Sequence, residues 1–473
     1  MPSQSHTDRC CAYGPDPPCE IRAEQSRLSV DGSRLPSSYL CPPCLLALRR
    51  GPPRRRAPAV ARPEKGRKTM TDLQTLIRFA VLPIVGDASR PSEFSRSMAA
   101  HPLIHQELPY EPRYTLYNRR LTAMSMTNRS ADDAYWRLRR HAILRHTGEL
   151  PIEIAGPDAE RLLNKVFTRD VSRNAVGRCS YQFACYEDGG MILDGILVRL
   201  AEDRFWYGQA DGDLTDWLRA HGSGMDVTIH DPEVWISQVQ GPASLDILAA
   251  AVDDAYPERF RYFDLAKVRI AGQEVVITRS GFTNELGWEI YLGPEIDADA
   301  VGARLLEVGA GFGMTPVAIG GARRIEAGLL NAGSDFDETT TPFAAGLGSM
   351  VNFEKGDFIG RAALEAADRR SRTWGMCVDD GGVAALGRTV RRDGAAVGRV
   401  CSTAWSPYQR CGVAIVRLDD PDDGPGAVVE VACHDGAARR GEICELPMYD
   451  RERRIPRGEL VDIPDLPDID DVI

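Results

Sequence analysis

Residues 150–167 read LPIEIAGPDAERLLNKVF, and residues 233–252 read EVWISQVQGPASLDILAAAV. In each stretch a strand-like run meets Gly-Pro and then apolar residues with the spacing of one helical face. Proline suits a first helical turn, because its fixed φ is already helical and its missing N–H has no partner there. The unit of strand, Gly-Pro and helix therefore occurs at Gly156 and again 85 residues later at Gly241. This repeat predicts a pseudo-duplicated, two-lobed α+β core.

Short strands with turn residues between them surround both copies and predict antiparallel sheets. The predicted strand pairs are 196–200 with 205–209 and 268–270 with 275–278, and the predicted helices cover 298–308 and 321–330. From about residue 372 to residue 450, β-rich runs alternate with Gly and Asp. That spacing is typical of a small barrel or sandwich.

The charge distribution divides the chain. Residues 1–97 carry 16 Lys and Arg against 9 Asp and Glu, whereas residues 98–473 carry 41 against 59. An acidic body repels phosphate backbones, so nucleic acid is not expected as a partner. The predicted segments are a disordered basic extension (1–97), a two-lobed core (98–370), a C-terminal β-barrel (371–455) and an acidic tail (456–473).

The composition indicates where the protein is located and whether it binds a metal. No run of about 18 apolar residues exists, so no membrane span is expected. No secretory signal begins the chain, so we expect a cytoplasmic protein whose 12 cysteines are free thiols. Cys41 and Cys44 lack a second pair at a similar spacing, so no metal site is expected.

A lone acid interrupts residues 181–199, YQFACYEDGGMILDGILVR. Asp188-Gly-Gly predicts a tight hairpin turn, and Asp194 stands four residues later in an otherwise apolar strand. A buried charge without a partner costs several kcal/mol, so Asp194 needs a reason to be there. A catalytic role is one explanation, and capping of a neighbouring turn is the other.

A second acid lies in residues 280–291, SGFTNELGWEIY, where Glu289 stands between Trp288 and Ile290. A carboxylate there can accept two parallel hydrogen bonds from an amidine-like edge, such as that of a pterin, while aromatic side chains pack on the ring. The alternative is that Glu289 faces solvent from an edge strand.

Together these residues resemble the glycine cleavage T-protein, or aminomethyltransferase, family and its tetrahydrofolate-dependent dimethylsulfoniopropionate demethylase branch. The matching pieces stand in the family's order over residues 114–450. They are 154–159 (IAGPDA), 187–190 with Asp194, 241–242, 280–290, 324–329 (RIEAGL), 357–361 (DFIGR), and Gly398 with Ser406-Pro407.

The resemblance implies a two-lobed core with a C-terminal barrel and tetrahydrofolate in a central site. Asp194 falls on the family's catalytic Asp, Glu289 on its pterin-binding Glu, and Tyr181 on a Tyr that shapes the pocket, with Trp288 expected against the cofactor. The family's folate-binding Arg is replaced by Gly320. Arg323 is near enough in sequence to substitute for it.

The resemblance leaves the carbon donor open. Residues 114–119, 135–146 and 206–217 resemble the demethylase branch more than the aminomethyl enzymes. A cationic methyl donor would need aromatic faces, for which Trp206, Tyr207 and Trp217 are candidates. The expected reaction moves a methyl or aminomethyl carbon from a small donor, or from a lipoyl carrier protein, to tetrahydrofolate. The alternative is a folate-binding accessory module of a demethylating complex.

Overall fold

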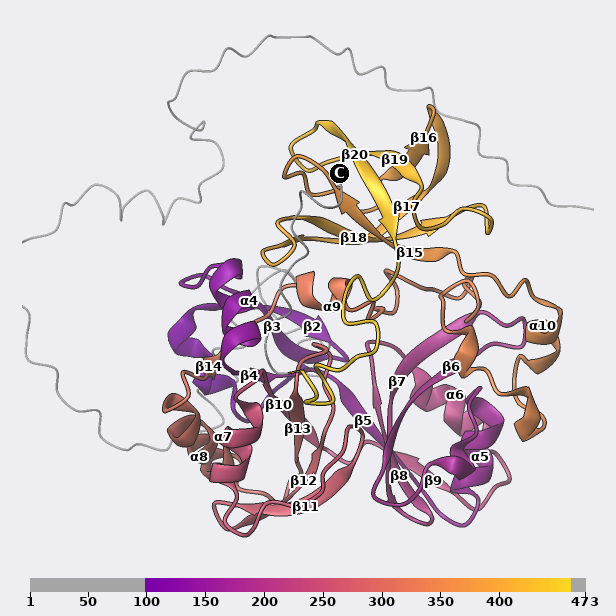
Figure 1. Cartoon of the computed structure of the whole chain (residues 1–473). Helices are drawn as coiled ribbons and strands as arrows, with labels where there is room; N and C mark the ends of the chain where they lie inside the picture. Colours follow the sequence, from indigo (N-terminus) through magenta and orange to yellow (C-terminus); the bar gives the residue numbers. More distant parts are fainter. Residues whose placement is uncertain (1–97, 461–473) are drawn as a thin grey trace, which may run out of the picture. The chain divides into compact units, whose positions relative to one another are not determined.

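The core contains the same strand order twice (Figure 1). The computed structural model describes residues 98–460. The first lobe's sheet holds, in order, β6 (Cys179–Cys185), β7 (Met191–Ala201), β8 (Arg204–Gln209), β5 (Leu150–Ala155) and β9 (Thr228–His230). The second lobe's sheet holds β11 (Leu265–Ile270), β12 (Gln273–Thr278), β13 (Gly287–Leu292), β10 (Trp235–Gln240), β4 (Ile143–His146) and β14 (Thr315–Pro316). The first five positions correspond, and all their pairings are antiparallel. The predicted α+β duplication is confirmed.

The two Gly-Pro junctions have the same geometry. Gly156 has φ 132° and Gly241 has φ 125°, a region that favours glycine. A Cβ at Gly156 would lie 2.5 Å from the carbonyl oxygen of Asp226, and one at Gly241 would lie 2.6 Å from that of His141. Glycine is therefore required at both junctions, because each lets a neighbouring chain segment approach closely.

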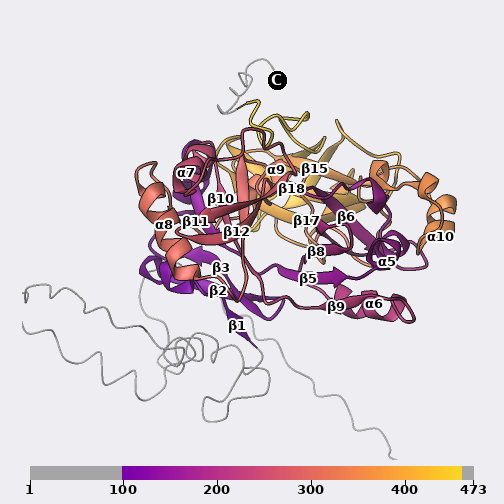
Figure 2. The ribbon, with the colours of Figure 1, turned by 90° about the horizontal axis from the view of Figure 1, so that it is seen from below.

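Helices cover the outer faces of both sheets (Figure 2). α5 (Ala159–Val166) and α6 (Leu214–His221) pack on the first sheet, and α7 (Ser244–Ala251) and α8 (Ala298–Ala310) pack on the second. The inner faces meet at what we call the lobe interface, formed by Cys179, Val198, Trp206, Val234, Ile236 and Tyr291. The rings of Trp206 and Tyr291 stack there with centroids 5.5 Å apart. Side chains on these inner faces therefore point toward the opposite lobe.

Shorter elements surround the lobes. β1 (Ala99–Ala100), β3 (Arg120–Met126) and β2 (Pro112–Tyr117) form a small sheet, followed by α4 (Ala131–Arg140). Ser130 caps α4 by accepting a hydrogen bond from the backbone N–H of Asp133. A further helix, α10, covers Arg361–Ala366, and single 3-10 turns lie at Ile104–Gln106, Leu108–Tyr110, Val171–Arg173, Gly348–Met350 and Phe353–Lys355.

The predicted helix over 321–330 is wrong in length. The observed helix, α9, covers only Ala322–Glu326. Gly328 has φ 63°, which is left-handed and ends the helix. The turn brings the following chain beneath Leu446, which lies 2.7 Å from a Cβ placed on Gly328.

The C-terminal strands close into a barrel, which decides between the barrel and sandwich predictions. Its order is β15 (Thr373–Val378), β18 (Cys411–Leu418), β17 (Ala395–Ser406), β16 (Thr389–Arg392), β19 (Val428–Ala432) and β20 (Ala438–Cys444). The predicted extension over 1–97 lies outside the described residues, as do residues 461–473 of the acidic tail. Residues 456–460 are described, and Gly458 packs against Arg279 of the second lobe.

Candidate active site

Asp194 on β7 is buried beside tyrosines. The Tyr181 hydroxyl donates a 2.7 Å hydrogen bond to its Oδ2 atom. Burial raises the pKa of Asp194 to about 6, although this hydrogen bond opposes the shift. Within residues 98–460 no Lys, Arg or His lies within ion-pair distance of the carboxylate, and no turn N–H binds it. The turn-capping alternative is therefore not supported, and a buried carboxylate with a raised pKa is the kind of group that can accept a proton.

Glu289 on β13 is buried and held by hydroxyl and amide groups. Its Oε1 atom accepts a 2.8 Å hydrogen bond from Gln238, and its Oε2 atom accepts bonds from Ser280 at 2.6 Å and Tyr291 at 3.3 Å. Burial raises its pKa, and the negative charge of Glu149 adds to the rise. β13 lies between β10 and β12, so the edge-strand alternative is wrong.

The two acids lie on the sheet faces that meet at the lobe interface. Side chains two residues apart in a strand share a face. Asp194 is therefore on the face of Val198, and Glu289 is on the face of Tyr291, and both Val198 and Tyr291 belong to the lobe interface.

Tyr117 and Glu149 connect the two acids electrostatically. Burial raises the pKa of Tyr117, and the charges of Glu149 and Asp194 raise it further. Glu149 acts in the same way on Glu289. Tyr117 is therefore within electrostatic reach of Asp194 and of Glu149, and Glu149 is within reach of Glu289, and we call these four residues the polar region.

Tyr117, Glu149 and Gln238 were not predicted from the sequence. Strand alternation could have indicated Gln238. It follows Ile236 by two positions in β10, so it is a polar residue on the same buried face. Tyr117 is the last residue of β2. Residues 114–119 resemble the family only as a whole stretch, so no feature of the sequence singled out Tyr117.

Trp288 lies away from this region. Adjacent residues of a strand point to opposite faces of the sheet, so Trp288 points away from the face that carries Glu289. Trp288 is fully buried in the core beneath α7 and α8. Trp206, Tyr207 and Trp217 are also engaged in packing: Trp206 donates to Glu153 and stacks at the lobe interface, Tyr207 donates to the carbonyl of Gln182, and Trp217 packs edge-on against Tyr186.

Arg323 is sequestered in a buried charge network. Its Nε atom lies 2.5 Å from Glu285, and it also faces Glu326 at 3.7 Å. Arg139 contacts the same two carboxylates, at 3.0 Å and 3.8 Å. The Tyr449 ring covers the Arg323 guanidinium at 5.2 Å. With two arginines balanced by two glutamates, Arg323 has no charge left for a ligand.

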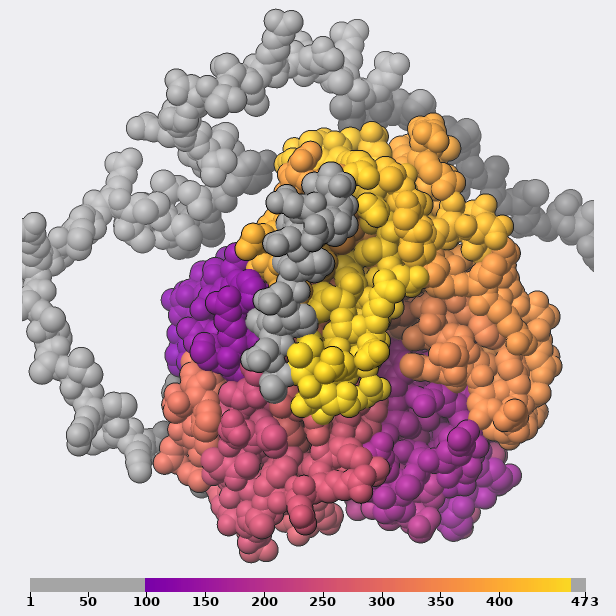
Figure 3. Space-filling model, viewed as in Figure 1, coloured from indigo at the N-terminus to yellow at the C-terminus, as the bar shows by residue number. Residues whose placement is uncertain are grey.

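Arginines of the C-terminal segment and the second lobe lie nearer to the site. The segment of residues 445–460 crosses the surface beside the second lobe (Figure 3). Arg453 and Arg457 of this segment, with Arg279, lie within electrostatic reach of Tyr262, as does Glu289. We call these three residues the arginine rim. Arg453 also acts on Tyr181.

Within the described chain the arginine rim forms no ion pair, although Asp450 acts electrostatically on Arg453 and Asp264 acts on Arg279. Arg453 donates to the side chain of Asn284 at 2.8 Å and to the carbonyl of Ala327 at 3.2 Å. Arg279 donates to the backbone carbonyl of Phe260, and Arg457 donates to that of Glu452. The rim is therefore a group of positive charges beside an acidic, buried site.

Comparison with known proteins identifies the family. The model of the GCVT N-terminal domain matches residues 84–355, and that of the glycine cleavage T-protein C-terminal barrel domain matches residues 372–450. The chain belongs to the glycine cleavage T-protein family. The resemblance expected from the sequence is thereby confirmed, and the observed barrel is the T-protein family's C-terminal domain.

Relatives within the T-protein family carry different names. A dimethylsulfoniopropionate demethylase of Ruegeria pomeroyi is 34% identical, over 68% of this chain and 90% of that protein. A trimethylamine-oxide aldolase of the same organism is 35% identical, over 65% of this chain and 41% of that protein. An aminomethyltransferase of Lysinibacillus sphaericus is 30% identical, over 65% of this chain and 86% of that protein. The crystal structure of a glycine cleavage system aminomethyltransferase from Bartonella henselae shares the fold, with a TM-score of 0.67 and 23% sequence identity. The match covers 75% of this chain and 99% of that one.

The polar region fits the cofactor that the T-protein family implies. Glu149 Oε2 and Gln238 Oε1 are buried acceptors without a hydrogen-bond donor among the described residues. Buried acceptors are normally paired, so these two point to a donor from a ligand. The edge of a reduced pterin offers several N–H donors. Among residues 98–460 no group of side chains could hold a metal ion, and no helix is long and apolar enough to cross a membrane.

Proposed function

We propose that this protein is a tetrahydrofolate-dependent one-carbon transferase, which moves a methyl or aminomethyl carbon from a small donor to the reduced pterin. The observation that carries the proposal is Asp194, a buried carboxylate with a pKa of about 6 and no ion pair among residues 98–460, which faces the same lobe interface as Glu289. A folate-binding accessory module would not need a poised base, so Asp194 favours the enzyme over that alternative.

Four residues of the site have roles in this proposal. Glu289 and Gln238 bind the donor edge of the pterin, and Tyr181 orients the Asp194 carboxylate. Tetrahydrofolate, when bound, supplies a nucleophilic nitrogen. In methyl transfer that nitrogen would attack the carbon of the donor, whose leaving atom would keep the electron pair of the broken bond. The Asp194 carboxylate accepts the proton that the nitrogen loses.

The donor is proposed from the relatives' names. Dimethylsulfoniopropionate and trimethylamine oxide both carry a methylated, positively polarised atom. The aminomethyltransferase relatives suggest delivery on a lipoyl carrier as the second possibility. The seven cysteines of residues 98–460 are free, which supports the proposed cytoplasmic location. Incubation with tetrahydrofolate and a panel of such donors, followed by mass analysis of the folate, tests the function.

Replacing Glu289 by Gln is expected to weaken tetrahydrofolate binding by about 1.5–3 kcal/mol, the usual value of a hydrogen bond to a charged group. The amide keeps the shape of the carboxylate but replaces one acceptor oxygen with a donor. Titration calorimetry measures the change. Glu274→Gln, an exposed strand residue paired with Lys267, is the matched control. Equal affinities of the Glu289→Gln variant and the wild type would remove Glu289 from the binding site.

Arg453 is expected to bind the carboxylates of the folate tail in place of Arg323. Arg453→Ala should weaken tetrahydrofolate binding about tenfold or more, as expected for a charge-assisted bond. Binding of a tetrahydropterin without the glutamate tail should not change, because only the tail carries the carboxylates. Arg451→Ala, on the same segment and exposed, is the control. An equal loss for both ligands would show that Arg453 acts on the fold and not on the tail.

A further inference from the structure

Three of the seven described cysteines gather on one face of the barrel. They are Cys377 on β15, Cys411 on β18 and Cys444 on β20 (Figure 1). β15 lies between the other two strands, and Cys377 is in register with Val413 on one side and Glu442 on the other. Cys411 and Cys444 stand two residues from those partners, so both lie diagonally across from Cys377 on the same face.

The three thiols lie on the outside of the barrel. Met376 and Val378, the neighbours of Cys377, pack in the barrel interior, and so does Ile443 beside Cys444. Adjacent strand residues point to opposite faces, so the two cysteines point outward. All three cysteines of this group are half-buried. The other four described cysteines are buried, namely Cys179, Cys185, Cys401 and Cys433.

Gly375 and Gln409 bring a fourth sulfur atom to the group. A Cβ placed on Gly375 would lie 2.8 Å from the Cys444 Sγ atom and 3.0 Å from the Cε atom of Met448, so the glycine leaves the space that these two side chains fill. The Gln409 side chain lies 3.9 Å from the Cys377 Sγ atom through Oε1 and donates from Nε2 to the Met448 Sδ atom at 3.3 Å. We call Cys377, Cys411, Cys444 and Met448 the sulfur cluster.

Cys377 is the most acidic thiol of the sulfur cluster. Hydrogen bonds from Cys411 and Cys444 lower its pKa, and the same contacts raise the pKa of both partners. One thiolate is therefore held beside two thiols. A thiolate, and not a thiol, attacks a peroxide, and a second thiol next to it can then close a disulfide. The sulfur cluster has both of these components.

Cys444 is better placed than Cys411 to close that bond. Diagonal positions in neighbouring strands have Cα atoms about 7–8 Å apart and a disulfide needs about 4.4–6.8 Å, so one strand must shift by roughly 1 Å. Cys444 is the last residue of β20 and is still paired with β15, opposite Gly375. Cys411 lies beyond the last pair between β15 and β18, and it pairs with Ser406 of β17 instead.

We propose that the sulfur cluster is an oxidant-sensitive site, in which Cys377 reacts with hydrogen peroxide and then forms a disulfide with Cys444. The Cys377 sulfur attacks one peroxide oxygen, the O–O bond breaks, and the other oxygen leaves as hydroxide. This step gives a sulfenic acid on Cys377. The Cys444 sulfur then attacks that of Cys377, the S–O bond breaks, and the oxygen leaves as water. Two thiols are oxidised to one disulfide, and the peroxide is reduced to two molecules of water.

The disulfide joins β15 to the residue after which the C-terminal segment begins. Met448 of this segment belongs to the sulfur cluster, and its backbone N–H donates to the carbonyl of Glu326 at 2.7 Å. Tyr449, the next residue, bonds to the Glu326 side chain. Oxidation therefore places a covalent link where the barrel meets the buried charge network.

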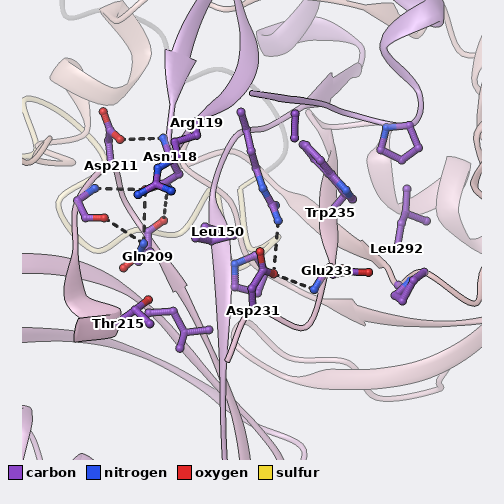
Figure 4. Close-up of a pocket in the computed structure, with 18 of the residues that line it drawn as sticks. Asn118, Arg119, Leu150, Gln209, Asp211, Thr215, Asp231, Glu233, Trp235 and Leu292 are labelled. Atoms are coloured by element: carbon purple, nitrogen blue, oxygen red, sulfur yellow. Dashed lines mark hydrogen bonds and ion pairs between the residues drawn. The ribbon is translucent and has the colours of Figure 1, made fainter. Parts of the chain in front are cut away.

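The sulfur cluster does not belong to the pocket that Figure 4 shows. That pocket has a volume of about 930 Å³ and is lined by residues of the small sheet and both lobes, among them Asn118, Gln209 and Trp235. None of the described residues that line it is a cysteine or belongs to the barrel. Substitutions in the sulfur cluster therefore leave the walls of this pocket unchanged.

Peroxide treatment of the reduced full chain, followed by alkylation of the remaining thiols and tryptic mapping without reduction, tests the proposal. Cleavage after arginine places the three cysteines in separate peptides, residues 373–388, 411–417 and 441–451. The expected product links 373–388 to 441–451 and disappears after dithiothreitol. Cys377 should lose its free thiol about tenfold faster than the buried Cys401.

Two variants separate the steps. Cys377→Ser should form no link and leave Cys444 fully alkylated, whereas Cys444→Ser should leave a sulfenic acid on Cys377, which dimedone traps. Cys401→Ala, in a neighbouring strand of the barrel, is the control and should form the link as the wild type does. Complete alkylation of wild-type Cys377 after peroxide, or a link from 373–388 to 411–417 in place of the expected one, would overturn the proposal.

Discussion

Replacing Asp194 by Asn should lower kcat for one-carbon transfer by about 10²–10⁴-fold, the usual contribution of a positioned general base. The amide preserves the size of the side chain and can still accept the hydrogen bond from Tyr181, which is 2.7 Å long in the wild type. It cannot accept a proton from the folate nitrogen. Methylated folate formed per enzyme is the measurement, and tetrahydrofolate affinity should stay within about twofold.

The same carboxylate sets the expected pH dependence. The rate should rise with pH until Asp194 ionises at about pH 6, and then level off, because only the carboxylate accepts the proton. The folded-state pKa is above the ordinary value of 3.8, so ionisation opposes folding as the pH rises from about 4 to 6. The Asn variant should therefore be at least as stable as the wild type at pH 7. Wild-type turnover in this variant would exclude Asp194 from the mechanism.

Replacing Glu326 by Ala is expected to lower the free energy of unfolding by about 3–5 kcal/mol, because it leaves buried arginines short of one counter-charge. Glu326 is fully buried and accepts hydrogen bonds from Tyr135 of α4, Ser406 of β17 and Tyr449 of the C-terminal segment. The substitution therefore removes bonds that join a helix of the core, the barrel and the last described segment. Urea unfolding measures the loss of stability. Glu307→Ala, which changes an exposed side chain of α8, is the control.

Arg323→Ala separates a structural role from a ligand-binding role. We expect it to destabilise the fold as Glu326→Ala does, since it leaves Glu285 and Glu326 with Arg139 alone. A variant of unchanged stability that binds folate poorly would instead restore Arg323 as the tail anchor.

The sequence predicted those parts of the molecule that depend on local patterns. The two Gly-Pro junctions could be predicted because Gly156 and Gly241 each meet a positive φ and a close chain approach. Asp194 and Glu289 could be singled out because acids are costly in buried strands.

The remaining parts of the site depend on partners that are distant in the chain. Arg323 is unavailable only because Glu285 and Arg139 meet it in space. The rim residue Arg453 lies more than 250 residues after Tyr181, on which it acts. By contrast, the prediction that Trp288 lies against the cofactor was wrong, and strand alternation alone could have excluded it once Glu289 was assigned to the site.

The C-terminal segment affects when the protein becomes competent during its synthesis. The ribosome makes residues 445–460 after both lobes and the barrel strands, yet these residues supply Tyr449 to the charge network and Arg453 to the rim. A nascent chain can thus complete every sheet while it still lacks Arg453, the residue that we propose binds the folate tail. A truncation before residue 449 would remove both residues and so reproduce the incomplete chain.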